Sequence, residues 1–423
     1  MTRSFLFLQG PHGPFFRQLG RQLRAAGARV CRVGFNQGDA IFWGRQDYVA
    51  FTSPQEDWPE TLAALLVSKQ VTDLVLYGDS RPIHAEAVRQ AKAAGLRIHV
   101  FEEGYLRPYW VTYERDGSNS RSKLMTIPVT AMREALARPG AEHPPGPPHW
   151  GDMRQHMFYG ALYHFFVLAL NGRYRNFRPH RDIDVATEFR LHLWRFLRMP
   201  LNRIERRLAA WRIRRAGYPY HLVLLQLEHD ASFRHSSTLR SMGEFIDLCL
   251  DAFAKGAAAH HHLVFKAHPL EDGRAPLARL IRNGARSRGL QTRVHFLPGG
   301  KLAPLLRDAA SAVTVNSTAA QQALWRGLAV KTLGQAVYDK PELVSARSLA
   351  AFFSAPDGPD SRAYTDYRQF LLETSQVAGG FYSSSGRRRA LRRVVDMMLR
   401  EADPYEALLG QGAAQPQHAR RIK

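Results

Sequence analysis

The chain has 423 residues, of which 45% are hydrophobic and 23% charged, a composition that is typical of a globular protein and excludes disorder over the whole length. Lys and Arg number 59 against 37 Asp and Glu, so the formal net charge of +22 favours an anionic partner such as nucleic acid, a membrane face or a phosphorylated small molecule. The two cysteines, Cys31 and Cys249, exclude a disulfide-built secreted fold. Because the apolar run before Gly10 is too short for a signal peptide, we expect a cytosolic protein.

The first 100 residues predict strands that alternate with helices. Strands are expected over residues 5–8, 30–33, 73–77 and 97–101, and helices are expected up to residue 26 and over 58–69 and 83–94. This alternation is typical of βαβ units and a parallel sheet. The pattern ends near Pro128, and the Pro- and Gly-rich stretch 139–148 indicates a linker.

Two segments that differ from this pattern follow the linker. Residues 157–170 form an apolar run of 14 residues with one His, which is shorter than the roughly 20 residues of a membrane-spanning helix and predicts a buried or interfacial helix. Between Arg173 and Arg215 the chain has 13 Arg and only four acidic residues, with apolar residues at helical spacing and Pro200 between two halves. Such a basic amphipathic segment fits a membrane surface or, equally, two helices packed on the body with a solvated Arg face.

The alternating pattern resumes after the basic segment. Strands are expected over 221–225, 262–266, 294–296, 312–315 and 329–333, and helices over 239–255, 276–284, 301–307, 319–326, 367–374 and 387–401. We therefore predict an α/β fold with two Rossmann-like domains that face each other across a cleft. The expected divisions are an N-terminal Rossmann-like domain (1–130), a linker and basic helical insert (131–215), a C-terminal Rossmann-like domain (216–345) and C-terminal helices (346–423).

Ligands of open parallel sheets bind at the carboxyl ends of the strands, and carboxylates stand at two of these positions. Glu102 and Glu103 follow the strand 97–101, where like charges favour one raised pKa and acid/base chemistry, although two solvated loop acids, one paired with Arg107, explain them as well. Asp230 follows the strand 221–225 and either caps a turn or faces Glu103 across the cleft. Two carboxylates that flank a sugar are the minimal machinery of glycosyl chemistry.

Donors suited to a phosphate follow two other strands of the second domain. Lys266, His268 and Pro269 follow one strand, and Asn316, Ser317 and Thr318 open a helix after another. Hydroxyls and free backbone N–H groups at a helix start bind anions, although an ordinary Ser/Thr N-cap is the alternative. Together the two groups predict a phosphate held between His268 and the Ser317/Thr318 pair.

Further polar groups at strand ends of the first domain are candidates for an acceptor site. They lie in the runs 9–13, 36–39 and 78–81, and turn chemistry explains them equally well. We expect no metal: Asp182-Ile183-Asp184 has no strand before it, and three adjacent histidines at 260–262 cannot direct their rings at one ion. The sequence has neither a Walker loop nor a G-x-G-x-x-G run.

An ordered set of these motifs resembles the capsular-polysaccharide biosynthesis proteins of the KpsS/LipB type. The set consists of Phe7-Leu8-Gln9-Gly10, Gly13-Pro14-Phe15-Phe16, Phe35-Asn36-Gln37-Gly38-Asp39, Tyr77-Gly78-Asp79, Glu102-Glu103-Gly104-Tyr105-Leu106-Arg107-Pro108, Lys266-Ala267-His268-Pro269, Asn316-Ser317-Thr318 and Gln376-Val377-Ala378-Gly379-Gly380-Phe381-Tyr382. The resemblance implies a GT-B-type glycosyltransferase on the inner face of the bacterial inner membrane, with other capsule assembly proteins as partners. It implies transfer of Kdo from CMP-Kdo, without a cofactor or metal, to a phosphatidylglycerol-type lipid that starts the linker of a capsule.

The resemblance also implies that the domain 1–130 is the acceptor side and the domain 216–345 is the nucleotide-sugar side, and it implies roles for individual residues. Glu103, or its neighbour Glu102, would be the acid/base, and Asp230 would be the nucleophile of a retaining reaction. The expected donor-binding residues are Gln226, Lys266, His268, Pro269, Asn316, Ser317 and Thr318, and the expected acceptor-binding residues are Asn36, Asp39, Asp79, Arg81 and Arg107.

Two other functions compete with this prediction. A non-catalytic capsule assembly or export factor that binds lipid-linked polysaccharide would need the basic insert but neither Glu103 nor Asp230. A nucleic-acid-binding protein would show affinity that falls steeply with salt, but no helix-turn-helix or zinc pattern supports it.

Overall fold

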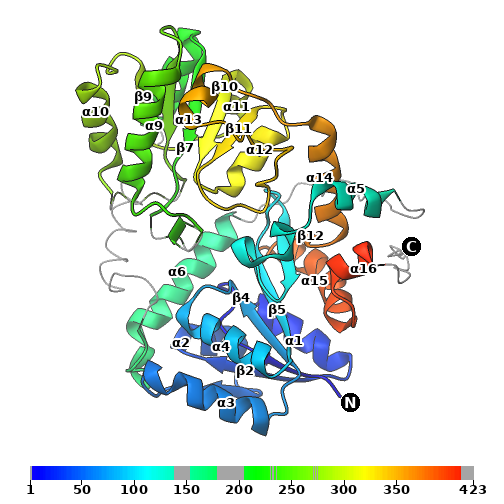
Figure 1. The fold of residues 1–423 in the computed structure, drawn as a ribbon. Coiled ribbons are helices and arrows are strands. Elements are labelled where there is room, and N and C mark those ends of the chain that lie inside the picture. The colour runs from blue at the N-terminus through cyan, green and yellow to red at the C-terminus, as the bar shows by residue number, and fades with distance from the viewer. Residues whose placement is uncertain are drawn as a thin grey trace. The chain divides into compact units, whose positions relative to one another are not determined.

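The structure is a computed structural model that describes residues 2–137, 153–178, 204–228, 230, 233–234, 236–269, 271, 273 and 275–410. It divides into two compact units (Figure 1). The first unit contains Met1–Lys123, Thr130–Thr187 and Arg368–Lys423, and the second contains Leu124–Val129 and Glu188–Tyr367. Each unit has its own sheet, so the predicted α/β class with two Rossmann-like domains is confirmed.

The first unit is built on a seven-stranded sheet with the order β12-β6-β5-β4-β1-β2-β3. The strands are β1 (Ser4–Phe7), β2 (Arg29–Gly34), β3 (Tyr48–Ala50), β4 (Asp73–Tyr77), β5 (Arg97–Glu103), β6 (Trp110–Arg115) and β12 (Gln376–Ala378). The first five are parallel, whereas β6 and β12 are antiparallel to their neighbours. Strands buried on both faces read as continuous apolar runs, which is why Leu74–Leu76 was recognisable in the sequence.

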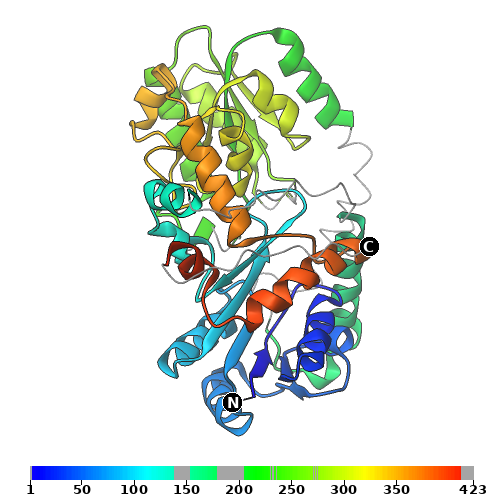
Figure 2. The ribbon, with the colours of Figure 1, turned by 90° about the vertical axis from the view of Figure 1, so that its right-hand side faces the viewer.

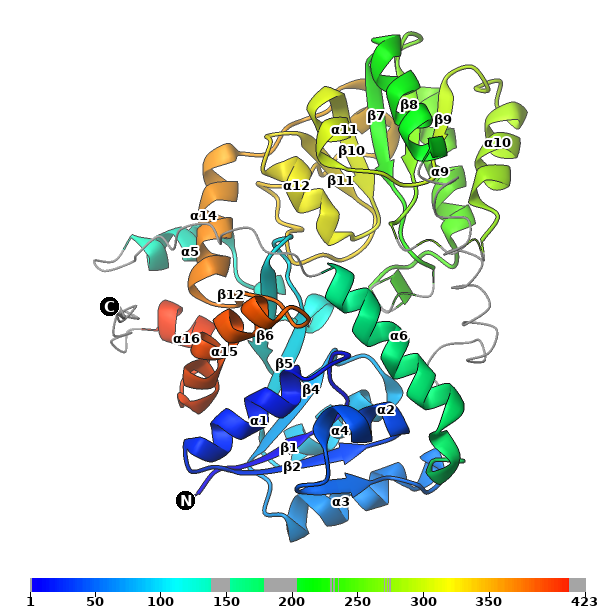
Figure 3. The same cartoon turned by 180° about the vertical axis from the view of Figure 1, so that it is seen from behind.

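Helices cover both faces of this sheet. The helices that belong wholly to the unit are α1 (Phe15–Ala25), α2 (Gln37–Trp43), α3 (Trp58–Ser68), α4 (Pro82–Ala93), α6 (Met153–Ala169), α15 (Ser384–Leu399) and α16 (Pro404–Leu409). Phe5 and Phe7 pack with α1 and α15 on one face, where these two helices lie side by side (Figures 2 and 3). Leu6 and Leu8 pack with α3 and α4 on the other. The alternation along β1 is the two-residue period of a strand.

The second unit has a parallel five-stranded sheet with the order β11-β10-β7-β8-β9. Its strands are β7 (Tyr220–Leu224), β8 (His262–Lys266), β9 (Val294–Leu297), β10 (Ala309–Thr314) and β11 (Ala329–Thr332), and its helices are α9 (Met242–Gly256), α10 (Leu277–Ser287), α11 (Ala303–Asp308), α12 (Gln321–Leu324) and α13 (Leu349–Ser354). Two further helices, α5 (Val129–Leu136) and α14 (Ser361–Glu373), contain residues of both units. α9, α10 and α13 bury one face of the sheet around Phe245, Ile281 and Phe353.

In each sheet, strands are added first on one side of the first strand and then on its other side. In the first unit β2 and β3 lie on one side of β1, and β4 and β5 lie on the other; in the second unit β8 and β9 lie on one side of β7, and β10 and β11 on the other. The crevice at the carboxyl ends of the strands at such a switch point is where open α/β sheets bind ligands. The switch points lie between β1 and β4 in the first unit and between β7 and β10 in the second.

Three features differ from the elements expected from the sequence. β12, from the C-terminal part, pairs with β6, so residues 368–423 belong to the first unit and do not form a separate helical segment. The turn 36–39, expected as a loop, opens α2, because the Asn36 side chain accepts a bond from the Asp39 N–H as its N-cap. The helix expected over 319–326 consists of a 3₁₀ turn, Thr318–Ala320, and the short α12.

Candidate active site

The acid/base candidate Glu103 is the last residue of β5, at the carboxyl edge of the first sheet. The Tyr77 hydroxyl, at the end of β4, donates to Glu103 Oε1 over 3.1 Å, and the Tyr382 hydroxyl donates to the same oxygen over 3.2 Å. Burial raises the pKa of Tyr77 well above its ordinary value, with a further contribution from the Glu103 charge. Tyr77 therefore stays protonated at neutral pH, and one carboxylate oxygen of Glu103 is held by two hydroxyl donors.

Glu102 lies on the same strand and supports this turn. Its Oε1 accepts a hydrogen bond from the Glu103 backbone N–H over 3.0 Å. The turn after β4 passes close by at Gly78, whose φ is +68° and where an added Cβ would lie 3.3 Å from Glu102 Oε2. A glycine is thus required at this close approach.

Sequence reasoning did not select Tyr77 or Tyr382 as site residues, although both stand in motifs that carried the resemblance. Tyr382 follows β12, more than 270 positions after Glu103. It stacks on the His156 ring of α6 with ring centroids 4.2 Å apart. The late position of the Gly379-Gly380-Phe381-Tyr382 run hid its role, because only the pairing of β12 with β6 brings it to the sheet edge.

Three of the predicted acceptor residues, Asn36, Asp39 and Asp79, make hydrogen bonds within the loops of the first unit. Asp39 is buried, and its carboxylate accepts from Arg32 over 2.9 Å, from Gln9 over 3.1 Å and from the Phe35 N–H over 3.0 Å. Asp79 is buried and accepts from the Ser118 N–H and pairs with Arg121 at 3.3 Å. These carboxylates, and Asn36 as the cap of α2, stabilise loops of the first unit.

The other two predicted acceptor residues are more accessible. Arg107 is exposed, and its Nε donates to the Gly104 carbonyl over 3.2 Å, a contact with the backbone in place of the carboxylate pairing considered above. Arg81 is partly buried and lines a pocket together with Gln9. Of the two, Arg81 is the acceptor candidate that lines a pocket.

In the second unit the switch point between β7 and β10 carries an amide pair. Gln226 Nε2 donates to Asn316 Oδ1 over 2.8 Å, and the Asn316 N–H donates to Gln226 Oε1 over 2.9 Å. Both residues are buried, and Asn316 Nδ2 also contacts the Ser236 carbonyl at 3.4 Å. Gln226 and Asn316, both predicted to bind the donor, therefore hold each other in place at the carboxyl edge of the second sheet.

The predicted phosphate ligands lie beside this pair. Lys266 is the last residue of β8 and lies opposite Leu224 of β7. Burial, together with the charge of Arg206, lowers the pKa of Lys266 to about 8. His268 is partly exposed and Pro269 is exposed immediately after it. Lys266 is still mainly protonated at neutral pH, so a cation lies at the carboxyl edge of the sheet.

Ser317 and Thr318 form the start of the 3₁₀ turn after β10. Ser317 Oγ accepts a hydrogen bond from the Ala319 N–H over 3.3 Å. This is the N-cap geometry that the sequence offered as the alternative to a phosphate site. The Tyr338 hydroxyl donates to the Ser317 carbonyl over 2.6 Å. A capping hydroxyl accepts with a lone pair and keeps its own hydrogen for donation, so the cap does not prevent Ser317 from binding an anion.

The nucleophile candidate Asp230 lies in a turn that follows β7. Its N–H donates to the Leu227 carbonyl over 3.0 Å, and its carbonyl accepts from the Arg234 N–H over 3.1 Å. The residue is exposed. Glu103 and Asp230 thus belong to different units, as the sequence predicted.

Among the described residues, no group of three or more His, Cys, Asp or Glu side chains is arranged to hold a metal ion. The histidines of the run 260–262 contact other rings: His261 bonds His221 over 2.9 Å, and His262 bonds His295 over 2.9 Å. The Asp182-Ile183-Asp184 run and most of the Arg-rich segment lie outside the described residues.

Comparison with known proteins identifies relatives along most of the chain. The capsule polysaccharide export protein KpsS of Escherichia coli is 29% identical over 385 residues, which cover 90% of this chain and 97% of that protein. The capsule polysaccharide modification protein LipB of Neisseria meningitidis serogroup B (strain ATCC BAA-335 / MC58) is 31% identical over 398 residues, which cover 90% of this chain and 92% of LipB.

Two solved structures are also similar. Thermosulfurimonas dismutans KpsC, a beta Kdo 2,7 transferase, has a TM-score of 0.43 and 12% identity, covering 94% of this chain and 100% of that one. A glycosyltransferase from Rickettsia africae ESF-5 has a TM-score of 0.38 and 8% identity, covering 97% and 99%. The model of the family described as "Capsule polysaccharide biosynthesis protein" matches residues 72–382. Since that match spans well over half of the chain and the LipB relative is more than 30% identical along nearly all of it, the chain belongs to the capsule polysaccharide biosynthesis protein family.

Proposed function

We propose that this protein is a glycosyltransferase that moves Kdo from CMP-Kdo to a phosphatidylglycerol-type lipid and so starts the lipid-linked linker of a capsule. Membership of the capsule family supports the pathway, and the motif set described above supports the donor and acceptor. The observation that carries the enzymatic role is Glu103, a carboxylate at the carboxyl edge of the first sheet with one oxygen held by two tyrosine hydroxyls.

The second unit is the proposed donor side. His268, Ser317 and Thr318 bind the CMP phosphate in this proposal, above the Gln226–Asn316 pair. The Lys266 ammonium adds positive charge nearby, where burial keeps it poorly hydrated. Hydrogen-bond donors and a cation that are already in place stabilise the charge that develops on a leaving phosphate, so the proposed reaction uses no metal or other cofactor.

The proposed chemistry is a double displacement with retention. Asp230 attacks the anomeric carbon of Kdo while the bond from that carbon to the CMP oxygen breaks, so a glycosyl ester forms and CMP leaves. The acceptor hydroxyl then attacks the same carbon, Asp230 leaves as a carboxylate, and Glu103 takes the hydroxyl proton. Tyr77 and Tyr382 hold Glu103 Oε1, so we assign the proton transfer to Oε2 and assign this base to Glu103, with Glu102 in support.

We further propose that the protein acts at an anionic membrane surface, in the cytoplasm. On α6, the apolar side chains of Met157, Phe158, Phe165 and Leu168 are exposed by 40–60%. In the helical stretch 204–216, Ile204, Leu208 and Trp211 are exposed and alternate with arginines. No helix in the described ranges has the length and hydropathy needed to cross a bilayer. Exposed apolar side chains among cations favour binding in the plane of an anionic interface.

The activity is tested by incubating the full chain with CMP-Kdo and phosphatidylglycerol vesicles. We expect CMP release together with a lipid that has gained the mass of one Kdo, and loss of both in Glu103→Gln. Binding of lipid-linked polysaccharide without CMP release would overturn the enzymatic proposal and identify a non-catalytic assembly or export factor.

A further inference from the structure

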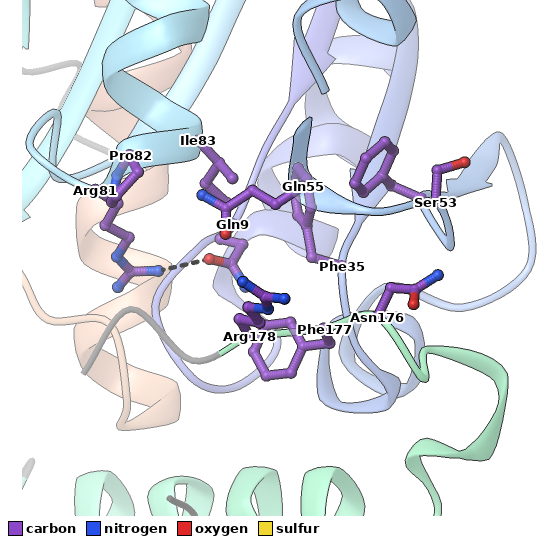
Figure 4. A pocket seen from close by; sticks show the side chains of 11 residues that line it. Gln9, Phe35, Ser53, Gln55, Arg81, Pro82, Ile83, Asn176, Phe177 and Arg178 are labelled. Carbon is purple, nitrogen blue, oxygen red and sulfur yellow. Dashed lines mark hydrogen bonds between the residues drawn. The ribbon is translucent and has the colours of Figure 1, made fainter. Parts of the chain in front are cut away.

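The first unit contains a pocket at the carboxyl edge of its sheet, at the switch point between β1 and β4. Gln9 follows β1 and Arg81 follows β4, while Phe35 and Phe51 follow β2 and β3. Figure 4 shows these side chains with those of Phe177 and Arg178. The cavity volume of the pocket is about 50 Å³, and the pocket is open to solvent. Its place in the sheet is where a doubly wound domain binds a ligand.

The polar part of the pocket is built around a fixed arginine. Arg81 NH1 donates to Gln9 Oε1 over 3.2 Å, and Gln9 Nε2 donates to the buried Asp39 carboxylate over 3.1 Å. Asp39 in turn pairs with the buried Arg32 at 2.9 Å. This chain of contacts orients Arg81, whose guanidinium has four further N–H donors. Asp39, one of the predicted acceptor residues, thus helps to position a group that reaches the pocket.

A second guanidinium, that of Arg178, stands at the pocket, and none of the described residues that line it is an Asp or Glu. In the view of Figure 4 the two guanidinium groups lie on either side of Gln9. A guanidinium group binds phosphate oxygens with bidentate geometry. The charge of the pocket therefore favours an anion, and a phosphoryl group in particular.

The remaining lining is suited to a short hydroxylated carbon chain. Phe35, Phe51 and Phe177 supply aromatic walls, and the Phe35 and Phe51 rings pack against each other at 5.6 Å. The amides of Gln55 and Asn176 supply hydrogen-bonding groups, and Asn176 Nδ2 also donates to the Thr52 carbonyl over 2.8 Å. Apolar walls with a few placed polar groups are typical of small-ligand sites.

The pocket is also connected to the catalytic candidate. The Arg81 guanidinium lies 6.0 Å from the centroid of the Tyr77 ring, and the Tyr77 hydroxyl bonds Glu103. A ligand held by Arg81 is therefore bound one side chain away from the base that we assign to the acceptor hydroxyl.

From these features we infer that the pocket binds the phosphate ester of a small polyol, with the phosphoryl group on Arg81 and Arg178 and the carbon chain against the aromatic walls. The inference rests on the proposed function for its link to a lipid acceptor. The same ester occurs in the head group of phosphatidylglycerol and as free glycerol phosphate, and the experiment distinguishes the two.

The test is a calorimetric titration of the full chain without any sugar donor. The probes are sn-glycerol 3-phosphate, dihexanoyl phosphatidylglycerol below its micelle concentration, and dihexanoyl phosphatidylcholine. We expect at least one phosphoglycerol probe to bind, and Arg81→Gln and Arg178→Gln each to weaken it about tenfold or more, as the loss of a charge-assisted contact does. The matched control is Arg45→Gln, which removes the same charge from an exposed site outside the pocket.

The comparison of probes identifies the source of the ester. Tighter binding of dihexanoyl phosphatidylglycerol than of glycerol phosphate assigns the pocket to the lipid head group, and equal binding assigns it to the free ester. The inference is overturned if neither phosphoglycerol probe binds, if Arg178→Gln binds as the wild type does, or if Arg45→Gln weakens binding as much as the pocket variants. Because no donor is present, failure of Kdo transfer leaves this result unchanged.

Discussion

At the scale of single residues, the candidate site depends on how Glu103 is held. Its Oε1 accepts hydrogen bonds from two tyrosines that come from opposite ends of the chain. Tyr77 is not expected to exchange a proton, because burial raises its pKa, and Tyr382 donates to the same oxygen. Their role is therefore to position the carboxylate, and this separates them from Glu103 in a kinetic experiment.

We expect Tyr77→Phe and Tyr382→Phe to lower kcat for Kdo transfer by about tenfold each, since each removes one hydrogen bond to a charged group. The KM for CMP-Kdo should change little, because the donor is assigned to the second unit. Glu103→Gln serves as the reference for complete loss of the base, at about a hundredfold or more. Steady-state kinetics check this, and a rise in KM with unchanged kcat would assign the tyrosines to binding instead.

A second residue-scale prediction concerns Glu114, a buried carboxyl on β6. It accepts hydrogen bonds from the hydroxyls of Tyr105, Ser122 and Tyr405, yet burial dominates and raises its pKa from 4.5 to about 7. Between these two values the folded protein keeps a proton that the unfolded chain has lost. The stability that this proton contributes is present at acidic pH and is lost as the pH rises through about 7.

Glu114→Gln keeps the shape of the side chain and cannot ionise. We expect the free energy of unfolding of the wild type to fall relative to that of the variant as the pH rises from 5 to 8. Urea unfolding at several pH values measures this difference. Parallel stability profiles for the two proteins would show that Glu114 has no raised pKa in the folded state.

At the scale of elements, α6 has two different faces. Tyr159 and Tyr163 pack on Phe42 of α2, and Tyr163 accepts a hydrogen bond from Asn36 over 2.6 Å. The opposite face exposes Phe158 and Phe165, by 60% and 56%. The apolar run thus forms one helix that is anchored on the first unit by its tyrosines and leaves aromatic side chains in contact with solvent.

We expect the double variant Phe158→Ser/Phe165→Ser to lose binding to anionic vesicles by about tenfold or more, because each phenylalanine buried in an interface contributes roughly 1.5–3 kcal/mol. Val67→Ser is the matched control, since Val67 on α3 is also exposed, by 78%, and lies outside this helix. Vesicle flotation measures the binding. Equal recovery of the wild type on neutral and anionic vesicles would remove the electrostatic part of the proposal.

At the scale of the whole molecule, each of the two units carries polar groups at the switch point of its own sheet. The first has Gln9 and Arg81 with Glu103 on a neighbouring strand, and the second has Gln226 and Asn316 with His268 on the next strand. The proposed reaction takes its base from the first unit and its nucleophile from the second. Removing either carboxylate alone should therefore stop the transfer.

We expect Asp230→Ala to abolish Kdo transfer, and we expect a wild-type reaction with a slow acceptor to leave the mass of Kdo on the peptide that contains Asp230. Peptide mass spectrometry detects the ester. An unchanged transfer rate in Asp230→Ala, or a product with the inverted anomer, would replace the double displacement by a single displacement with Glu103 as base.

The sequence by itself determined the features that depend on neighbouring residues. Apolar runs such as Leu74–Leu76 identified the parallel strands, because these strands are buried on both faces. Polar residues directly after such runs identified Glu103, Gln226, His268 and Asn316 as strand-end positions, because the chain leaves the sheet there whatever the rest of the fold does. The ordered motifs likewise indicated the family, which the comparisons confirm.

Only the tertiary structure decided which of these residues meet. Gln376–Ala378 is too short to predict as a strand, and it pairs with a strand about 265 positions earlier, so the contact of Tyr382 with Glu103 has no local signal. The burial of Asp39 and the bond from Arg81 to Gln9 also join separate loops. Local sequence patterns report the conformation of a segment and which of its faces is apolar. The side chains that share a sheet edge depend on strand order, which is set by packing between distant parts of the chain.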